Sequence, residues 1–178
     1  MGGEDAFVQK LDSLFTVDSS LEGEMISSDI SGLIGQYAHG NEPSHHVIHL
    51  YNYVNRPWRT QELVDSVYQS QYANSTDGLS GNEDCGQMSA WYILNSMGFY
   101  QVCPGKPIYS IGRPAFDKAV INLPEEKTFS IVVKNNEKKN KYIESVTLNG
   151  QPLNTPFFHH QDLSLIHISE PTRHAQIS

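Results

Sequence analysis

The sequence predicts an α+β protein whose helices come first and whose strands follow. Residues up to about 100 carry apolar positions at helical spacing, whereas the stretches after "CPGKP" are short, β-branched and roughly alternating. Hydrophobic residues make up 38% of the chain and aromatic residues 10%, which is enough for a packed core. A length of 178 residues suits one domain or slightly more.

The spacing of apolar residues predicts a series of helices in the first part. They cover residues 3–15, Pro43 to about 54, 60–68, and about Gly86 to Met97. Pro43 suits the first turn of a helix, and Gly98 is a natural stop for the last one.

Short alternating runs predict strands in the second part. They lie at 108–112, 118–123, 128–135 and 141–150, with Asn149-Gly150 as a hairpin turn. The change from helices to antiparallel strands is therefore expected near residues 101–107.

The composition excludes several classes of function. A net charge of −8 argues against nucleic acids and anionic membrane surfaces as partners. Cys85 and Cys103 are too few for a disulfide scaffold. No apolar run is long enough to span a membrane, and "MGGEDAFVQK" has no apolar core of a signal peptide.

The final segment, residues 163–178, has a composition unlike the rest of the chain. "LSLIHISEPTR" resembles the in-frame translation of a sequencing-library adapter. We therefore expect this tail to be non-native and leave it out of the fold prediction, and we expect the protein to be truncated at its C-terminus.

Two polar segments contain the candidate site residues. "QYAHGNEPSHH", residues 36–46, places Asn41 and Glu42 at the start of a predicted helix, where the helix dipole favours an anion. "GNEDCGQ" places Asn82, Glu83 and Asp84 in the same way, just before the helix predicted from about Gly86. Either carboxylate could simply cap its helix. Alternatively, the two segments converge on a polar cleft that activates water or holds calcium.

Other side chains in these segments have weaker interpretations. His45 and His49 have the i, i+4 spacing of zinc ligands, but no acidic ligand accompanies them at a matching offset, which favours a buried structural role for His49. Aromatic residues could stack on sugars or belong to the core; these are Tyr37, Trp58, Trp91 and Tyr92.

The segments "GLIGQYAHGNEPSHHVIHLYNYVNRPWRTQ" and "DGLSGNEDCGQMSAWYILNSMGFYQVCPG" resemble the C-terminal signature blocks of glycoside hydrolase family 92. This family consists of calcium-dependent exo-acting α-mannosidases. The resemblance extends over residues 1–162. It implies that residues 1–103 are the last helices of an (α/α)₆ barrel, that 104–162 form a small antiparallel β segment, and that the rest of the catalytic domain is missing.

The resemblance implies hydrolysis of terminal α-mannose, in N-glycans or mannans, with inversion. Inverting enzymes hold a carboxylic acid and a carboxylate base roughly 6.5–9.5 Å apart, with a water between them. Asp84 matches the family's base. Many members carry an Asp where this chain has Asn82, so Asn82 could orient the water but could not share the base role.

The resemblance also implies a calcium site and a mannose pocket. Glu42 and Asn41, with His39, match the block that lines the pocket near the calcium, and Glu42 and Asn41 are the candidate ligands. Gln87 and Glu83 are further candidates for contact with the sugar. The family's general acid is a Glu upstream of these blocks, so the chain is expected to be inactive alone.

Two alternatives remain open. One is a non-catalytic carbohydrate-binding module, which would bind mannose without turnover. The other is a different (α/α) carbohydrate enzyme, such as a phosphorylase or lyase, but residues 36–46 and 81–91 contain no Lys or Arg for a phosphate pocket. Linkage preference, with α-1,2 the first expectation, depends on regions outside this chain. The resemblance suggests a secreted or periplasmic bacterial protein.

Overall fold

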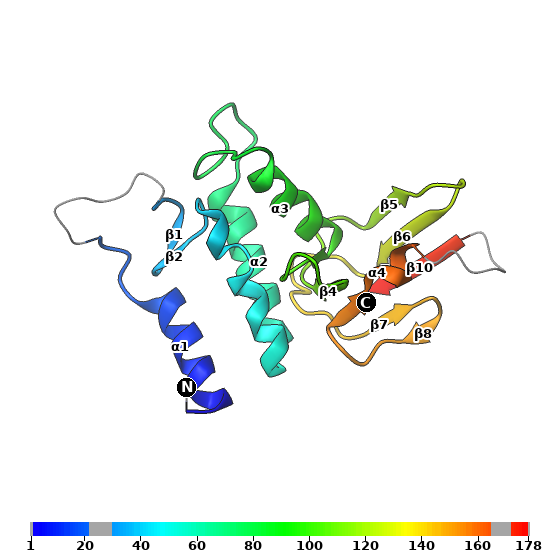
Figure 1. Ribbon diagram of the computed structural model, residues 1–178, viewed down its shortest axis with the longest axis horizontal. Helices are drawn as coiled ribbons and strands as arrows, with labels where there is room; N and C mark the ends of the chain where they lie inside the picture. The colour runs from blue at the N-terminus through cyan, green and yellow to red at the C-terminus, as the bar shows by residue number, and fades with distance from the viewer. Residues whose placement is uncertain (1, 22–29, 165–171, 178) are drawn as a thin grey trace.

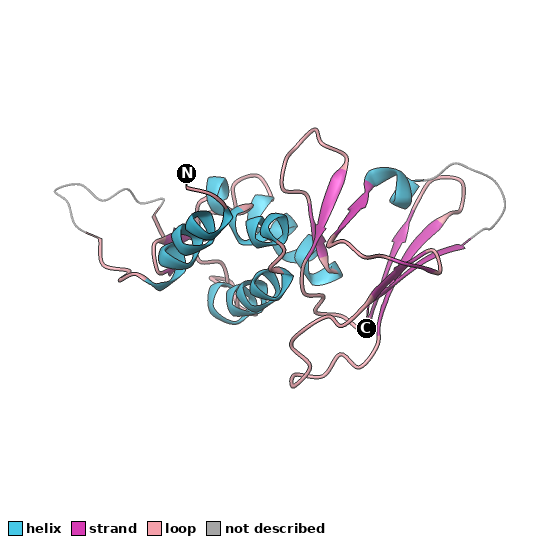
Figure 2. Cartoon of the chain, turned by 90° about the horizontal axis from the view of Figure 1, so that it is seen from below, coloured by secondary structure: helices cyan, strands magenta, loops and turns pink. Residues whose placement is uncertain are grey.

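The computed structural model describes residues 2–21, 30–164 and 172–177. Helices gather in one half of the molecule and strands in the other, in the order of the chain (Figure 1). A view from below shows the same separation (Figure 2). The mixed α and β class predicted from the sequence is confirmed.

The helical half is built from three α-helices, two 3₁₀ segments and a short hairpin. They are α1 (Glu4–Thr16), β1 (Leu33–Ile34), β2 (Tyr37–Ala38), η1 (Glu42–Ser44), η2 (Val47–Val54), α2 (Pro57–Gln71) and α3 (Gln87–Met97). α3 ends at Gly98, whose φ of 102° is the left-handed C-cap that the sequence predicts.

The prediction of one regular helix from Pro43 to residue 54 is wrong, because the structure forms two 3₁₀ segments there. A 3₁₀ helix, with three residues per turn, suits this stretch better than an α-helix, with 3.6 residues per turn. It places Ile48 and Tyr51 together against the apolar core, and His49 and Asn52 together, so that both can bond to the Ser110 hydroxyl.

One apolar core joins the helices. Fully buried side chains from η2, α2 and α3 meet in it, with Phe15 and Leu11 of α1 closing one side. Trp91 of α3 has no exposed surface and packs edge-on against His39 and parallel to Tyr72. At roughly 25 cal/mol per Å² of apolar area, this cluster is the main stabilising term in the helical half.

The other half contains two small sheets. The first is antiparallel, with the order β3 (Phe99–Tyr100), β4 (Ile108–Ile111) and β9 (Phe157–His159). The second has the order β5 (Lys118–Asn122), β6 (Thr128–Val133), β10 (Thr172–Ile177), β7 (Val146–Leu148) and β8 (Gln151–Pro152). A short helix, α4 (His160–Ser164), follows β9.

The predicted hairpin turn at Asn149-Gly150 is confirmed. These two residues connect β7 to β8 and both have positive φ, 52° and 77°, as a two-residue hairpin turn of the primed type requires. The sheets share a second apolar core around Phe99, Phe129 and Phe158.

Part of the tail packs on the strand half of the molecule. Leu163 is buried in the second core, and β10 pairs parallel with β6 and antiparallel with β7. Strand pairing uses main-chain groups, which every sequence carries, so an unusual composition does not prevent it. The adapter origin of residues 163–178 stays a prediction, as do the domain boundaries near 103 and 162.

None of the helices in the described part of the chain has the length and hydropathy needed to cross a membrane.

Candidate active site

Two glycines bring the polar segments 36–46 and 78–86 into backbone contact. A Cβ on Gly81 would lie 2.7 Å from both the Cα and the carbonyl oxygen of Gly40. A Cβ on Gly40 would in turn meet the Ser31 hydroxyl and lie 3.1 Å from the Ser80 carbonyl oxygen. The convergence predicted for these segments is therefore present, and it depends on side chains being absent at two positions.

The backbone around Asp84 is in an uncommon conformation. Asp84 and Cys85 have φ values of 48° and 56°, and Gly86, the N-cap of α3, has 94°. Left-handed conformation costs roughly 1–2 kcal/mol for each residue that is not glycine. The turn holds Asp84 at the surface, and its side chain makes no cap hydrogen bond, so the capping interpretation of Asp84 is wrong.

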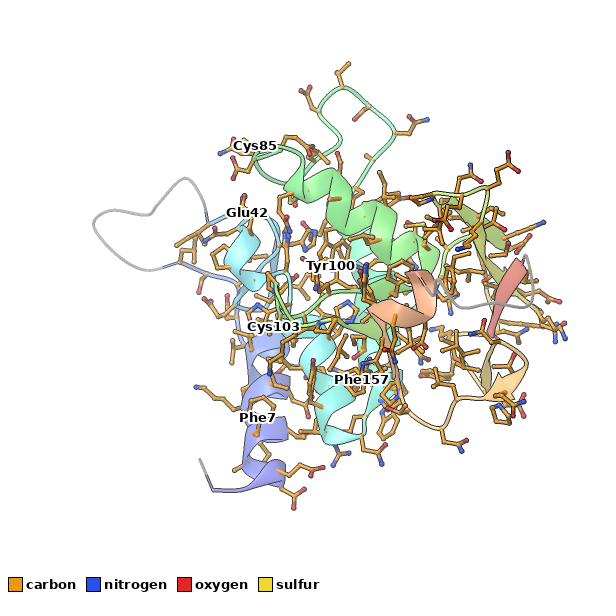
Figure 3. The ribbon with its side chains drawn as sticks, turned by 45° about the vertical axis from the view of Figure 1, so that its right-hand side comes forward. Phe7, Glu42, Cys85, Tyr100, Cys103 and Phe157 are labelled. Carbon is orange, nitrogen blue, oxygen red and sulfur yellow. The ribbon has the colours of Figure 1, made fainter. Side chains whose placement is uncertain are left out.

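Glu42 does not cap a helix either. It lies in η1, whose N-cap is Asn41, and η1 has no side-chain cap bond. The Glu42 Oε1 atom is buried and accepts no hydrogen bond from the described residues. Figure 3 shows Glu42 at the end of the molecule where Cys85 and the start of α3 lie.

The carboxyl groups of Glu42 and Asp84 interact directly. A carboxyl–carboxyl hydrogen bond with Glu42 raises the pKa of Asp84 above its usual value of 3.8, and desolvation and charge repulsion act in the same direction. The site therefore contains an acidic couple assembled from segments far apart in the sequence.

The two neighbours of Asp84 differ in their roles. The Glu83 carboxylate accepts hydrogen bonds from the Ser89 backbone N–H, at 3.2 Å, and the Ser89 hydroxyl, at 2.9 Å. It thus stabilises the first turn of α3 instead of facing the couple. Asn82 is exposed, as a group that orients a water would need to be.

His39 is not placed to touch a substrate. It has no exposed surface, and its ring nitrogens bond to the hydroxyls of Tyr37, at 2.9 Å, and Tyr72, at 2.8 Å. The Tyr72 hydroxyl donates onward to the Met88 carbonyl oxygen. Burial lowers the pKa of His39 to about 3, so it is neutral and structural. Its predicted contact with the sugar is wrong because its polar atoms are already used inside the core.

Two of the four candidate aromatic residues also belong to the core. Tyr37 and Trp91 are buried. Tyr92 is accessible and lines, with Tyr68 and Tyr72, an open hollow of about 640 Å³ beside residues 73–79. Trp58 is exposed, with the Arg56 guanidinium over its ring.

The zinc interpretation of His45 and His49 does not fit their contacts. His49 is buried between the Ser110 hydroxyl, at 3.1 Å, and Asn95 Oδ1, at 2.9 Å, as the structural interpretation predicted. His45 bonds to the His39 carbonyl oxygen and to the Gln87 side chain.

Sequence reasoning missed the bond between His45 and Gln87 and the contact of Gln87 with Tyr100. These residues come from three separate segments, and no local pattern announces a hydrogen bond between them.

The side-chain donors of the site suit calcium in part. Calcium prefers oxygen ligands, and the orphan Glu42 Oε1 beside the Asp84 carboxyl fits that preference. Within residues 2–21, 30–164 and 172–177, no group of three or more His, Cys, Asp and Glu side chains could enclose a metal ion. The described residues thus fit one side of a calcium site and would leave the other ligands to water, sugar or other protein groups.

Comparison with known proteins identifies the family. The model of the glycosyl hydrolase family 92 catalytic domain matches residues 1–167. A secreted glycosidase from Arthroderma benhamiae, itself uncharacterised, is 30% identical over 164 residues, which is 90% of this chain and 19% of that protein. The chain thus spans about a fifth of the length of this curated relative.

Solved structures show the same fold. A family 92 α-mannosidase from Bacteroides thetaiotaomicron in complex with mannoimidazole superimposes with a TM-score of 0.87 and 37% identity, over 98% of this chain and 22% of that one. An inverting family 92 mannosidase from the same organism has a TM-score of 0.78 and 36% identity, over 99% of this chain and 24% of its own. The chain belongs to glycoside hydrolase family 92.

Proposed function

We propose that this chain supplies the water-activating side of an exo-α-mannosidase that releases terminal mannose with inversion. One observation carries the proposal: Glu42 and Asp84 come together from two separate segments, and neither carboxylate caps a helix. The family relationship, and two relatives described as a mannosidase and an inverting mannosidase, support mannose-containing glycans as the substrate class.

Asp84 is the proposed general base. In its ionised form it accepts a proton from a water, whose oxygen attacks the anomeric carbon on the face opposite the leaving group. A raised pKa makes Asp84 a stronger base than an ordinary exposed carboxylate, which brings its proton affinity nearer to that of a base working close to neutrality. Exposed Asn82 orients the same water through its side-chain amide.

The other half of the reaction needs a carboxylic acid to protonate the leaving oxygen. We assign that role to a Glu outside this chain, and we propose that the 178-residue chain does not hydrolyse mannosides by itself. Incubating the purified chain with α-1,2-, α-1,3- and α-1,6-mannobiose tests this point. Release of mannose above a buffer control would overturn it.

We further propose that calcium binds with Glu42 as a ligand and Asn41 beside it. Bound there, the ion would engage sugar hydroxyls and offset the charge of the acidic couple. Calorimetric titration of calcium into the chain should give binding that Glu42→Gln removes and that exposed Glu137→Gln leaves intact. Equal binding of calcium by both variants would mean that the ion binds at other residues.

The decisive experiment is performed on the full-length enzyme that contains this sequence. Asp84→Asn should lower kcat by at least about a hundredfold, the usual scale for a general base, with KM little changed. Proton NMR of the first product formed should show β-mannose from an α-mannoside. Initial formation of α-mannose would exclude inversion.

The proposal also covers linkage preference and secretion. We propose a preference for the α-1,2 linkage, which a comparison of kcat/KM for the three mannobioses tests. Secretion is proposed because the curated relative is described as a secreted glycosidase.

The alternative of a carbohydrate-binding module makes a separate prediction. If the full-length protein binds mannobiose tightly and Asp84→Asn changes neither binding nor product formation, the acidic couple has no catalytic role.

A further inference from the structure

The side-chain amide of Gln87 is bonded to two inward partners. Its Nε2 lies 3.1 Å from His45 Nδ1 and 3.1 Å from the Tyr100 hydroxyl. Gln87 is the first residue of α3, and its backbone N–H bonds to the Asp84 carbonyl oxygen at 3.2 Å. The bond to His45 therefore joins the segment of Glu42 to the segment of Asp84.

The tautomer of His45 follows from its partner on the other side of the ring. His45 Nε2 lies 2.9 Å from the backbone carbonyl oxygen of His39, which can only accept a hydrogen bond. Nε2 must therefore carry the proton. Because the His45 ring is buried and its nitrogens bond to a carbonyl and an amide and not to a carboxylate, the ring is neutral, which leaves Nδ1 as an acceptor.

An acceptor at Nδ1 determines the orientation of the Gln87 amide. If the amide were flipped, its oxygen would face the Nδ1 lone pair and the bond would become a repulsion. The NH₂ group therefore faces inward, and its two hydrogens go to His45 and Tyr100. The Gln87 Oε1 atom accepts no hydrogen bond from the described residues. Gln87 is half-buried, so its Oε1 atom can accept a hydrogen bond from a ligand.

We propose that His45 is a positioning residue which locks Gln87 so that it offers a ligand only its carbonyl oxygen. This inference rests on the proposed function and deepens it. An acceptor beside the base selects a ligand that brings a hydroxyl hydrogen, such as a neutral sugar, and disfavours a carboxylate or phosphate at the same place. Gln87 therefore acts as a specificity residue without taking part in proton transfer.

The first test needs no enzymatic activity. Long-range ¹⁵N–¹H NMR of the histidine-labelled 178-residue chain should show His45 as the neutral Nε2–H tautomer at pH 7. A predominant Nδ1–H form, or rapid averaging between the two, would overturn the proposal, whatever the chain binds.

The second test is a double-mutant cycle on the full-length enzyme with the mannobiose it hydrolyses fastest. Gln87→Glu removes both donors and should lower kcat/KM about tenfold, the effect of one lost hydrogen bond. His45→Phe releases the amide and should have a similar effect. Because one interaction is lost in both cases, the double variant should be no worse than the poorer single one.

Controls separate the possible outcomes. Exposed Gln161→Glu should leave kcat/KM unchanged, and melting temperatures should show that each variant is folded. Additive losses, or an unchanged kcat/KM in Gln87→Glu, would overturn the positioning role. A wild-type enzyme that hydrolyses none of the mannobioses would instead overturn the proposed function, while NMR would still decide the tautomer.

Discussion

Gly81 packs directly on the backbone of Gly40, with room for no side chain between them. A Cβ on Gly81 would lie 2.7 Å from two backbone atoms of Gly40. Backbone cannot rotate away as a side-chain tip can, so the loops would have to separate. This contact is what holds the Glu42 segment against the Asp84 segment.

Gly81→Ala should therefore destabilise the chain by about 1–3 kcal/mol, the usual cost of overpacking, and weaken the couple between Glu42 and Asp84. Urea denaturation measures the first effect. Gly81 is not among the glycines with positive φ, so this loss comes from the contact and not from backbone strain. Gly105→Ala tests strain without contact, because its φ is 84° and its Cβ would meet nothing within 4 Å. An unchanged free energy of unfolding in Gly81→Ala would mean that the two loops separate without cost.

Asp84→Asn should stabilise the folded chain, although it should lower kcat in the full-length enzyme. The folded-state pKa of Asp84 is raised, so between 3.8 and that higher value the folded chain binds more protons than the unfolded chain. Stability from this group is therefore lost as the pH rises through that window. Removing the charge relieves the repulsion from Glu42, a trade between stability and function that active sites often show.

The measurement is the melting temperature at pH 7 and at a pH below 3.8. Asp84→Asn should melt above wild type at pH 7, and the difference should shrink in acid. Asp77→Asn, an exposed acid in the preceding loop, should show no such pattern. A lower melting temperature for Asp84→Asn at pH 7 would mean that the carboxyl couple stabilises the fold.

Cys85 offers a test of the strained turn. Cys85 has a φ of 56°, which a β-branched side chain tolerates poorly, whereas Cys103 is equally exposed and is not among the residues with positive φ. Cys85→Val should cost about 1–2 kcal/mol, and Cys103→Val should stay within about 0.5 kcal/mol. Equal costs in chemical denaturation would show that the turn carries no strain.

Much of the fold could be predicted because it depends on local patterns. The apolar spacing of α1 and α3 and the Asn149-Gly150 turn are encoded in neighbouring residues. The 3₁₀ geometry of η2 could not be predicted, since it is imposed by the distant Ser110 that His49 and Asn52 both reach. Tertiary contacts override local propensity in such places.

The site was predicted in the same partial way. The sequence could mark Glu42 and Asp84 as unusual acids, and the structure brings them together. It could not show that His39 is enclosed by two tyrosine hydroxyls, because Tyr72 follows α2, 33 residues further along the chain. Polar residues look alike in a sequence whether they face a substrate or a buried partner.

Buried His49 predicts that the chain loses stability in mild acid. Burial lowers its pKa from 6.5 to about 4, so between these values the unfolded chain binds more protons than the folded one. Stability therefore falls as the pH drops through this window. Each such histidine contributes up to about 1.4 kcal/mol per pH unit to the slope.

His49→Gln removes this titration and should flatten the plot of unfolding free energy against pH between 6.5 and 4, although the variant will be less stable overall. Part of the slope should remain, because the pKa of His39 is also lowered, to about 3. Exposed His160→Gln is the matched control for the substitution itself. An unchanged slope in His49→Gln would mean that this ring takes up its proton without unfolding, through water that reaches the Asn95 and Ser110 side of the core.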